Sequence, residues 1–201
     1  MKKLVIFDLD GTLLNTIADL AHSTNYALNK LGYPTHEIEK YNFMVGNGID
    51  KLFERALPEE EKSKENVLRV RKEFVPYYDI HNADDSRPYP GIPELLSYLQ
   101  DAGVQIAVAS NKYQAATQKL VDHYFPEIHF TAVFGQREGV KVKPDPIIVS
   151  DILEVAKVAK EEVLYVGDSG VDMQTAANAG VTACGVTWGF RPRTELEEFN
   201  P

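Results

Sequence analysis

One short stretch near the N-terminus decides the fold: Leu4-Val5-Ile6-Phe7-Asp8-Leu9-Asp10-Gly11-Thr12-Leu13. Its first four residues are apolar and predict a buried strand, and two carboxylates follow before a glycine turn. The carboxyl end of such a strand is where α/β folds place their ligand sites. Paired carboxylates suit a hard cation, and one of them can also act as a nucleophile or as a general acid or base. Taken alone, the stretch could also be an ordinary solvated turn, because Asp and Gly are common turn residues.

The composition bounds the class of protein. A chain of 201 residues with 44% hydrophobic residues allows one large domain, or a core domain with a smaller companion. The net charge of −9 argues against a nucleic-acid partner, because phosphate backbones are bound by clustered Lys and Arg. The single cysteine, Cys184, cannot form an internal disulfide and is interpreted as a small buried residue. The first apolar run is too short for a signal peptide or a membrane span, so we expect a cytoplasmic protein with no membrane partner.

Short apolar runs alternate with helical patterns along most of the chain. This alternation predicts an α/β fold in which a parallel sheet is connected by crossover helices. The expected strands are Leu4–Phe7, Val104–Ala109, Phe130–Phe134, Val163–Val166 and Val181–Val186.

The alternation breaks between the first two expected strands, where residues 16–87 contain no convincing strand. Apolar residues at helical spacing predict a helix from Ile17 onward. Pro58 and the three glutamates after it predict the start of another helix, because proline and acidic residues are favoured in the first turn of a helix. A crossover needs only about a dozen residues, so this segment is expected to be an inserted helical domain. We therefore expect a core domain of residues 1–15 and 88–201 and a helical domain of residues 16–87.

Three further segments place polar groups beside expected strands or helices. Ser110-Asn111-Lys112 follows one strand with hydroxyl, amide and amine groups that can bind phosphate oxygens. Lys143 stands directly before a proline-initiated helix, and Asp168 and Asp172 follow another strand. Each segment alone could be a turn, a surface cation or a helix cap. Because the carboxyl ends of parallel strands meet at one edge, these groups together predict a metal-assisted phosphoryl-transfer site.

These segments resemble the four motifs of the haloacid dehalogenase superfamily, in order and in approximate spacing. The matching residues are Asp8-x-Asp10-Gly11-Thr12, Ser110, Lys143 and Gly167-Asp168-x-x-x-Asp172. The phosphoglycolate phosphatase branch is the more specific resemblance, carried by Asn111-Lys112, Lys143-Pro144-Asp145-Pro146, Ala176-Ala177-Asn178-Ala179-Gly180 and Val186-Thr187-Trp188-Gly189-Phe190. The resemblance spans nearly the whole chain and implies a Rossmann-like core with an inserted α-helical cap domain.

The same resemblance implies a Mg²⁺-dependent phosphatase that works through an aspartyl-phosphate. Asp8 would be the nucleophile, and Asp10 would protonate the leaving oxygen and then activate water. Mg²⁺ would be bound by Asp8, the backbone carbonyl of Asp10 and Asp168. Asp172 would orient Lys143 or a metal-bound water, or would bind the metal directly.

Phosphoryl oxygens would be bound by Ser110, the backbone of Asn111 and Lys143, with Lys141 as the alternative lysine. Gly46 lies in a segment that resembles the cap loop of phosphoglycolate phosphatases, and the alternative is a flexible turn between helices. Lys51 and Arg55 lie four residues apart on the next expected helix. They could bind a substrate carboxylate or form a solvated helix face.

Other functions stay open at this point. The acid at position 10 favours a phosphatase or a phosphomutase, so the alternatives are a phosphomutase of the β-phosphoglucomutase type and a pyrophosphatase on the same fold. A non-catalytic phosphate-binding protein is a further alternative. Gly167-Asp168-Ser169-Gly170 also resembles the sequence around a trypsin-like serine nucleophile, but that family is all-β and disulfide-bonded. We expect a small phosphorylated metabolite as partner, and a monomer or a homodimer.

Overall fold

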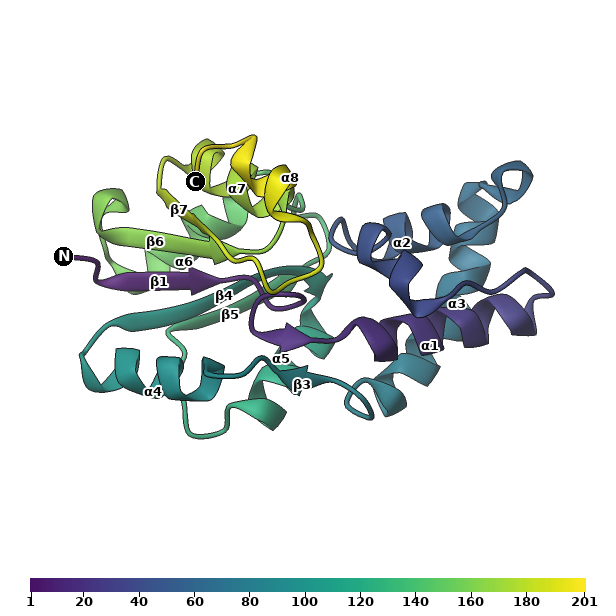
Figure 1. Ribbon diagram of the computed structural model, residues 1–201, viewed down its shortest axis with the longest axis horizontal. Coiled ribbons are helices and arrows are strands. Elements are labelled where there is room, and N and C mark those ends of the chain that lie inside the picture. Colours follow the sequence, from purple (N-terminus) through teal and green to yellow (C-terminus); the bar gives the residue numbers. More distant parts are fainter.

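A five-stranded parallel sheet forms the centre of the larger part of the molecule (Figure 1). The computed structural model describes residues 1–201. The strand order is β5-β4-β1-β6-β7, so the first strand of the chain lies in the middle. The strands are β1 (Leu4–Phe7), β4 (Gln105–Tyr113), β5 (Ala132–Gln136), β6 (Val163–Gly167) and β7 (Thr182–Gly185). The predicted α/β fold with a parallel sheet is therefore confirmed.

Helices cover both faces of this sheet, which explains why β1 is apolar at every position. Val5 and Phe7 pack into a cluster with α4 and α5, whereas Leu4 and Ile6 pack into a second cluster with α6 and α7. All four side chains are nearly inaccessible to solvent. The helix bounds are α4 (Ile92–Asp101), α5 (Gln114–Tyr124), α6 (Ile147–Ala156) and α7 (Gly170–Ala179). Two-sided burial fixes β1 rigidly and therefore fixes the residues that follow it.

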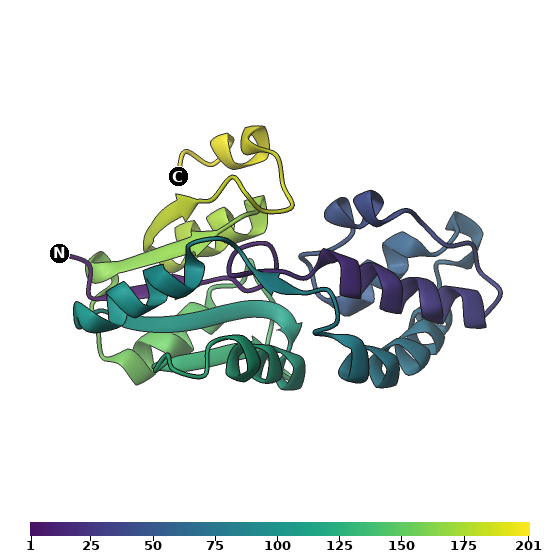
Figure 2. The same ribbon diagram turned by 60° about the horizontal axis from the view of Figure 1, so that its bottom comes forward.

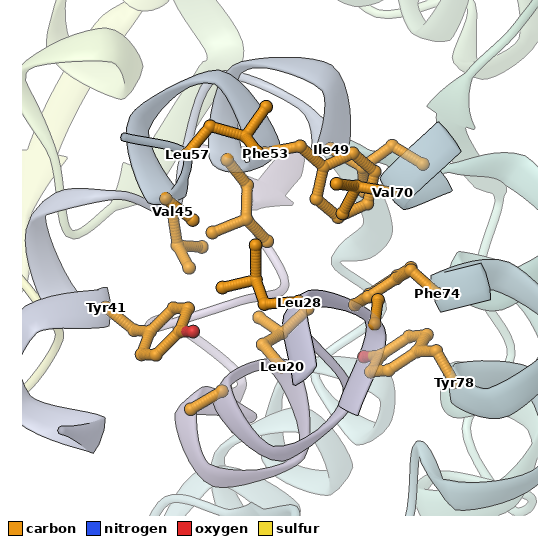
Figure 3. Packing of buried hydrophobic residues seen from close by; sticks show 14 of the residues in the cluster. Leu20, Leu28, Tyr41, Val45, Ile49, Phe53, Leu57, Val70, Phe74 and Tyr78 are labelled. Carbon is orange, nitrogen blue, oxygen red and sulfur yellow. The ribbon is translucent and has the colours of Figure 1, made fainter. Parts of the chain in front are cut away.

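A group of helices between β2 and β3 forms the second part of the molecule, here called the inserted helical unit (residues 17–81). It contains α1 (Ile17–Lys30), η1 (Ile38–Phe43), α2 (Ile49–Ala56), η2 (Glu59–Glu61) and α3 (Lys64–His81). Its own core holds Phe53, Phe74 and Tyr78, with 4.9 Å between the ring centroids of the first two and 5.0 Å between those of the last two (Figure 3).

Two short strands join this unit to the sheet. β2 (Leu14–Asn15) and β3 (Arg87–Pro88) pair in antiparallel register, with Leu14 opposite Pro88. The turned view in Figure 2 shows the chain leaving and re-entering the sheet part at neighbouring points. The sequence does not predict these strands, because each has two residues and one contains proline. Neither can show the two-residue alternation that is typical of a strand.

Two local expectations need correction. The helix predicted to start at Pro58 begins instead at Lys64, because the Ser63 hydroxyl accepts a hydrogen bond from Asn66 N–H at 3.2 Å. Pro58 precedes only the short helix η2. The strand expected to end at Ala109 continues as β4 to Tyr113, although its pairing with β5 is irregular over this stretch.

Two short helical elements flank the last two strands of the sheet. η3 (Lys160–Glu162) precedes β6, and α8 (Arg193–Glu197) follows β7. Both chain ends lie on the sheet part of the molecule (Figure 1). None of the helices has the length and apolar character needed to cross a membrane.

Candidate active site

A pocket opens where the carboxyl ends of β1, β4 and β6 face the inserted helical unit (Figure 1). Six of the predicted site residues line it: Asp8, Asp10, Gly46, Ser110, Asn111 and Asp168. Lys143 and Asp172 lie buried beside it, in contact with each other. The structure therefore brings residues from four distant segments of the chain together at one sheet edge.

Asp8 is the first residue after β1, and its N–H still donates to the Val166 carbonyl at 2.9 Å. This bond extends the sheet pairing and fixes the carboxylate at the base of the pocket. Lys143 Nζ lies 2.9 Å from Asp8 Oδ1. Burial, with the charges of Asp172 and Asp10, outweighs the lowering effect of Lys143 and raises the pKa of Asp8 to about 7.

Lys143 is buried within the site. Its Nζ donates to Asp172 Oδ1 at 2.8 Å and to the Ala109 carbonyl at 2.9 Å. Burial alone would lower the pKa of Lys143, but the Asp172 and Asp8 carboxylates outweigh it and hold that pKa well above its ordinary value. The alternative lysine, Lys141, is 82% exposed and lies 3.4 Å from Asp145, away from this cluster.

Asp172 uses both carboxylate oxygens within the protein. Oδ2 accepts hydrogen bonds from Ser169 N–H at 3.1 Å and from the Ser169 hydroxyl at 2.6 Å, which closes a capping box at the start of α7. Oδ1 accepts from Lys143 at 2.8 Å and from the Tyr165 hydroxyl at 3.3 Å. This geometry fits a residue that orients Lys143 better than a direct metal ligand.

Asp10 is held from two sides. Lys112 Nζ lies 3.0 Å from each of its carboxylate oxygens, and the Thr16 hydroxyl donates to Oδ1 at 2.6 Å. Lys112 is itself buried, with its ammonium 4.9 Å from the ring centroid of Tyr78 in α3. The sequence indicated Lys112 only as a possible ligand of phosphate oxygens, and its pairing with Asp10 was not predicted.

The Asp168 carboxylate is held in place by a backbone N–H group from a distant segment of the chain. Its Oδ2 accepts a hydrogen bond from Phe190 N–H at 2.7 Å, and Thr12 Oγ1 lies 3.4 Å from Oδ1. Burial, followed by the charges of Asp172 and Asp8, raises the pKa of Asp168 well above its ordinary value. A Cβ atom at Gly11 or at Gly189 would collide with the Asp168 side chain, so both positions require glycine.

Ser110 and Asn111 differ in whether their side chains keep a hydrogen-bond donor free for a ligand. The Asn111 amide nitrogen donates to the Gly46 carbonyl at 3.0 Å and to the Lys143 carbonyl at 3.1 Å, and its oxygen accepts from Lys143 N–H at 2.8 Å. Asn111 therefore links the inserted helical unit to the lysine segment through its side chain. The Ser110 hydroxyl accepts one bond, from Lys112 N–H at 3.2 Å, and keeps its own proton for a ligand.

Two predicted substrate-binding residues do not reach the pocket. Lys51 is exposed and pairs with Glu54 at 2.6 Å. Arg55 donates to the Met44 carbonyl and to Asn47 Oδ1, each at 2.7 Å, so it stabilises the loop around Gly46 from outside. The helical spacing is right, but α2 turns this face toward the loop and the solvent. Phe190, the last residue of a segment used for the family resemblance, and the next residue, Arg191, line the pocket instead.

The carboxylates fit a hard divalent cation. One oxygen each from Asp8, Asp168 and Asp172 lie within 4.8 Å of one another. Asp8 Oδ1 is buried and forms an ion pair with Lys143 Nζ, 2.9 Å away, but accepts no hydrogen bond. A buried anionic oxygen that lacks a hydrogen bond, beside further carboxylates, suits Mg²⁺ better than zinc, which prefers nitrogen and sulfur ligands.

A carboxylate centre with a buried lysine, at the carboxyl edge of a parallel sheet and next to an inserted helical unit, defines the class of this protein as an α/β enzyme. The chain belongs to the haloacid dehalogenase-like hydrolase family, whose model matches residues 5–186. This match confirms the superfamily expected from the four motifs.

Individual relatives agree along the full length of the chain. It is 33% identical over 204 residues to a phosphoglycolate phosphatase of Vibrio parahaemolyticus, covering 99% of this chain and 90% of that one. It is 34% identical over 201 residues to a phosphoglycolate phosphatase of Thiobacillus denitrificans, covering 97% and 88%. The crystal structure of a predicted phosphoglycolate phosphatase from Haemophilus somnus superposes with a TM-score of 0.91 at 30% identity, covering 100% and 92%. The resemblance to this branch is confirmed, and the protein is a hydrolase whose relatives are named phosphatases.

Proposed function

We propose that the protein is a Mg²⁺-dependent phosphatase that hydrolyses a small phosphomonoester, with 2-phosphoglycolate as the first candidate substrate. The observation that carries this proposal is the meeting of the Asp8, Asp10 and Asp168 carboxylates in one pocket, with Lys143 Nζ buried 2.9 Å from Asp8 Oδ1. The names of the relatives support the substrate class, because they are phosphoglycolate phosphatases along the whole length of this chain.

Asp8 is the proposed nucleophile. Its fixed position at the end of β1 lets a carboxylate oxygen attack phosphorus in line with the departing alkoxide, which forms an aspartyl-phosphate. Lys143 and the Ser110 hydroxyl bind the transferring phosphoryl oxygens and stabilise their charge. Lys143 is suited to this role because it is held in place before the substrate arrives.

Asp10 is the proposed general acid and base. It protonates the leaving oxygen in the first half of the reaction and takes a proton from the attacking water in the second half. Lys112 and Thr16 fix its orientation through contacts of 3.0 Å and 2.6 Å. Holding a carboxylate from both sides reduces the motion that would misplace the transferred proton.

The residues that would hold Mg²⁺ are Asp8, the backbone carbonyl of Asp10 and Asp168. When bound, the ion supplies positive charge to the phosphoryl group and to the three acids around it. Asp172 positions Lys143 and binds no metal in this proposal, because protein donors already engage both its oxygens.

We further propose that residues 16–87 are a cap domain over a core of residues 1–15 and 88–201. Its side of the pocket presents Leu20, Ile49 and Leu52, and its loop reaches the core through the Gly46 carbonyl and Asn111. Closure of such a cap excludes water and limits the size of the substrate.

The test is phosphate release from a panel of substrates, measured with Mg²⁺, with EDTA, and with Asp8→Asn as the blank. The panel contains 2-phosphoglycolate, a hexose phosphate, a nucleoside monophosphate and pyrophosphate. Release that needs Mg²⁺ and favours 2-phosphoglycolate is the expected result. A preference for pyrophosphate, or conversion of a sugar phosphate to its isomer without release, would assign the site to one of the alternative activities.

A further inference from the structure

Arg191 is a pocket residue to which the proposed mechanism gives no role. It follows Phe190, whose N–H binds the Asp168 carboxylate at 2.7 Å, so its backbone is fixed next to the acidic centre. Its side chain is 13% exposed, and the residue lines the same pocket as Asp8 and Asp168. Arg191 thus adds a largely buried cationic side chain to the lining of the space in which a substrate would lie.

The guanidinium of Arg191 lies over the Phe43 ring, 5.3 Å from its centroid, and is only loosely paired with a carboxylate. Its Nη2 donates to the carbonyls of Val45 at 3.2 Å and Phe43 at 3.4 Å, both in the loop of the inserted helical unit. The nearest acid is Glu195, with Oε2 3.9 Å from Nε, and the other oxygen of Glu195 accepts from Gly170 N–H at 2.9 Å. Its Nη1 and Nε therefore remain able to donate to a ligand.

The other cations of the site are already paired. Lys112 lies 3.0 Å from both oxygens of Asp10, and Lys143 lies between Asp8 and Asp172. Arg55, which holds the same loop from outside, is close enough for the charge of Arg191 to add to burial in lowering the pKa of Arg55. Two guanidinium groups therefore gather beside one pocket in a protein of net charge −9, which creates a local attraction for anions.

The rest of the pocket lining indicates which chemical groups this anion carries. On the side of the inserted helical unit, all residues that line the pocket are apolar or glycine: Leu20, Val45, Gly46, Gly48, Ile49 and Leu52. A sugar would leave several hydroxyl groups against these side chains without hydrogen bonds, which is costly. A short carbon chain that ends in an anion has no such groups.

We propose that Arg191 binds the carboxylate of a phosphorylated hydroxy acid, and so selects such substrates over phosphomonoesters of neutral alcohols. With Nη2 committed to the loop carbonyls, Nη1 donates to the carboxylate in a direction fixed by the guanidinium plane, which the freely rotating ammonium of a lysine cannot reproduce. Because Nη2 also holds the loop at Val45, a substrate carboxylate on Arg191 would join the loop to the core. This inference rests on the proposed phosphatase function and names the residue that gives it specificity.

The test compares two substrates that differ only in the distal group. We would measure kcat/KM for 2-phosphoglycolate and for its neutral amide, with an alkane bisphosphate as a further substrate, for the wild-type protein, Arg191→Gln and Arg191→Lys. Arg191→Gln is expected to lower kcat/KM for the acid about 100-fold and for the amide less than about 3-fold, as for loss of one partner of a buried charge pair. Arg191→Lys is expected to lie between, since it keeps the charge and loses the fixed direction of the donor.

Arg193→Gln is the matched control, because Arg193 is 74% exposed and pairs only with Glu197. It should leave both substrates unchanged. A melting curve for each variant checks folding, and Arg191→Lys carries the comparison if Arg191→Gln does not fold.

Three results would overturn the inference. Equal losses on acid and amide would mean that Arg191 acts only by holding the loop, and no loss would mean that it binds no substrate. A greater loss on an alkane bisphosphate than on the acid would assign the subsite to a second phosphate. The proposed phosphatase function fails separately, if the wild-type protein releases no more phosphate than Asp8→Asn from any of these substrates.

Discussion

Asp172 holds the Lys143 ammonium in place: Lys143 Nζ donates to Asp172 Oδ1 at 2.8 Å, and both side chains are buried. The other oxygen of Asp172 is bound to Ser169 at the start of α7, so the lysine is anchored to a helix terminus through one carboxylate. Burying such charges costs a large desolvation penalty, which a pair of apolar residues would avoid. The arrangement is therefore explained better by the positioning of Lys143 than by a gain in stability.

Asp172→Asn should destabilise the fold and impair catalysis together. The change removes the charge that faces Lys143, so a loss of about 3 kcal/mol in the free energy of unfolding is expected from broken buried pairs. Ser169→Ala, which removes only one hydrogen bond of the capping box, should cost about 1 kcal/mol. Denaturant unfolding of both variants checks this, and equal losses would show that Asp172 serves only as a helix cap.

Asp8→Asn should abolish turnover and leave the fold intact. An amide cannot attack phosphorus, so kcat is expected to fall by at least about 10³-fold. The same change removes a carboxylate that burial makes costly to ionise, so the metal-free variant should melt no lower than the wild-type protein at pH 8. Substantial activity in a variant confirmed by mass spectrometry would exclude Asp8 as the nucleophile.

The stabilising effect of Mg²⁺ should grow with pH. Burial raises the pKa of Asp8 from 3.8 to about 7, so between these values the folded protein keeps a proton that the unfolded chain has lost. The contribution of this group to the stability of the metal-free protein is therefore complete below about pH 4 and is lost as the pH rises toward 7. Burial acts in the same direction on the pKa of Asp168.

Because Mg²⁺ binds the ionised carboxylates, the increase in Tm on adding Mg²⁺ should be small at pH 5 and large at pH 8. Melting curves at several pH values, with and without the ion, measure this dependence. Asp8→Asn should weaken it, with Lys141→Gln as a surface control. An increase in Tm that is the same at pH 5 and pH 8 would contradict the prediction.

The parts of the fold that depend on local pattern could be predicted from the sequence. Leu4–Phe7 is uniformly apolar because helices cover both of its faces, and such a run is recognisable without knowing its partners. The start of α3 was missed because two capping signals compete within a few residues, and the serine at 63 forms the cap where Pro58 was expected to. No propensity rule decides between two such signals, since tertiary packing selects one of them.

The residues of the site divide in a similar way. Acids that directly follow a strand can be assigned to the sheet edge, because the direction of the strand fixes where they lie. Lys112 was indicated only as a possible phosphate ligand, and Arg191 was not identified. The contacts of both depend on distant groups, which are Asp10 for Lys112 and the carbonyl of Val45 for Arg191. Arg55 shows the converse case. Its helical spacing is regular, but its guanidinium donates to the carbonyl of Met44 in its own helical unit.

Lys112→Met should lower kcat through Asp10. The variant keeps most of the side-chain volume next to Tyr78 but removes the ammonium that lies 3.0 Å from both oxygens of Asp10. Asp10 would then be held by Thr16 alone, and a poorly oriented general acid is expected to lower kcat by about 10²-fold. A substrate with a good leaving group, such as p-nitrophenyl phosphate, needs little protonation and should lose much less activity. Equal losses on both substrates would place the effect of Lys112 on the nucleophile or the fold, and Lys141→Met controls for removal of a positive charge, because Lys141 is 82% exposed.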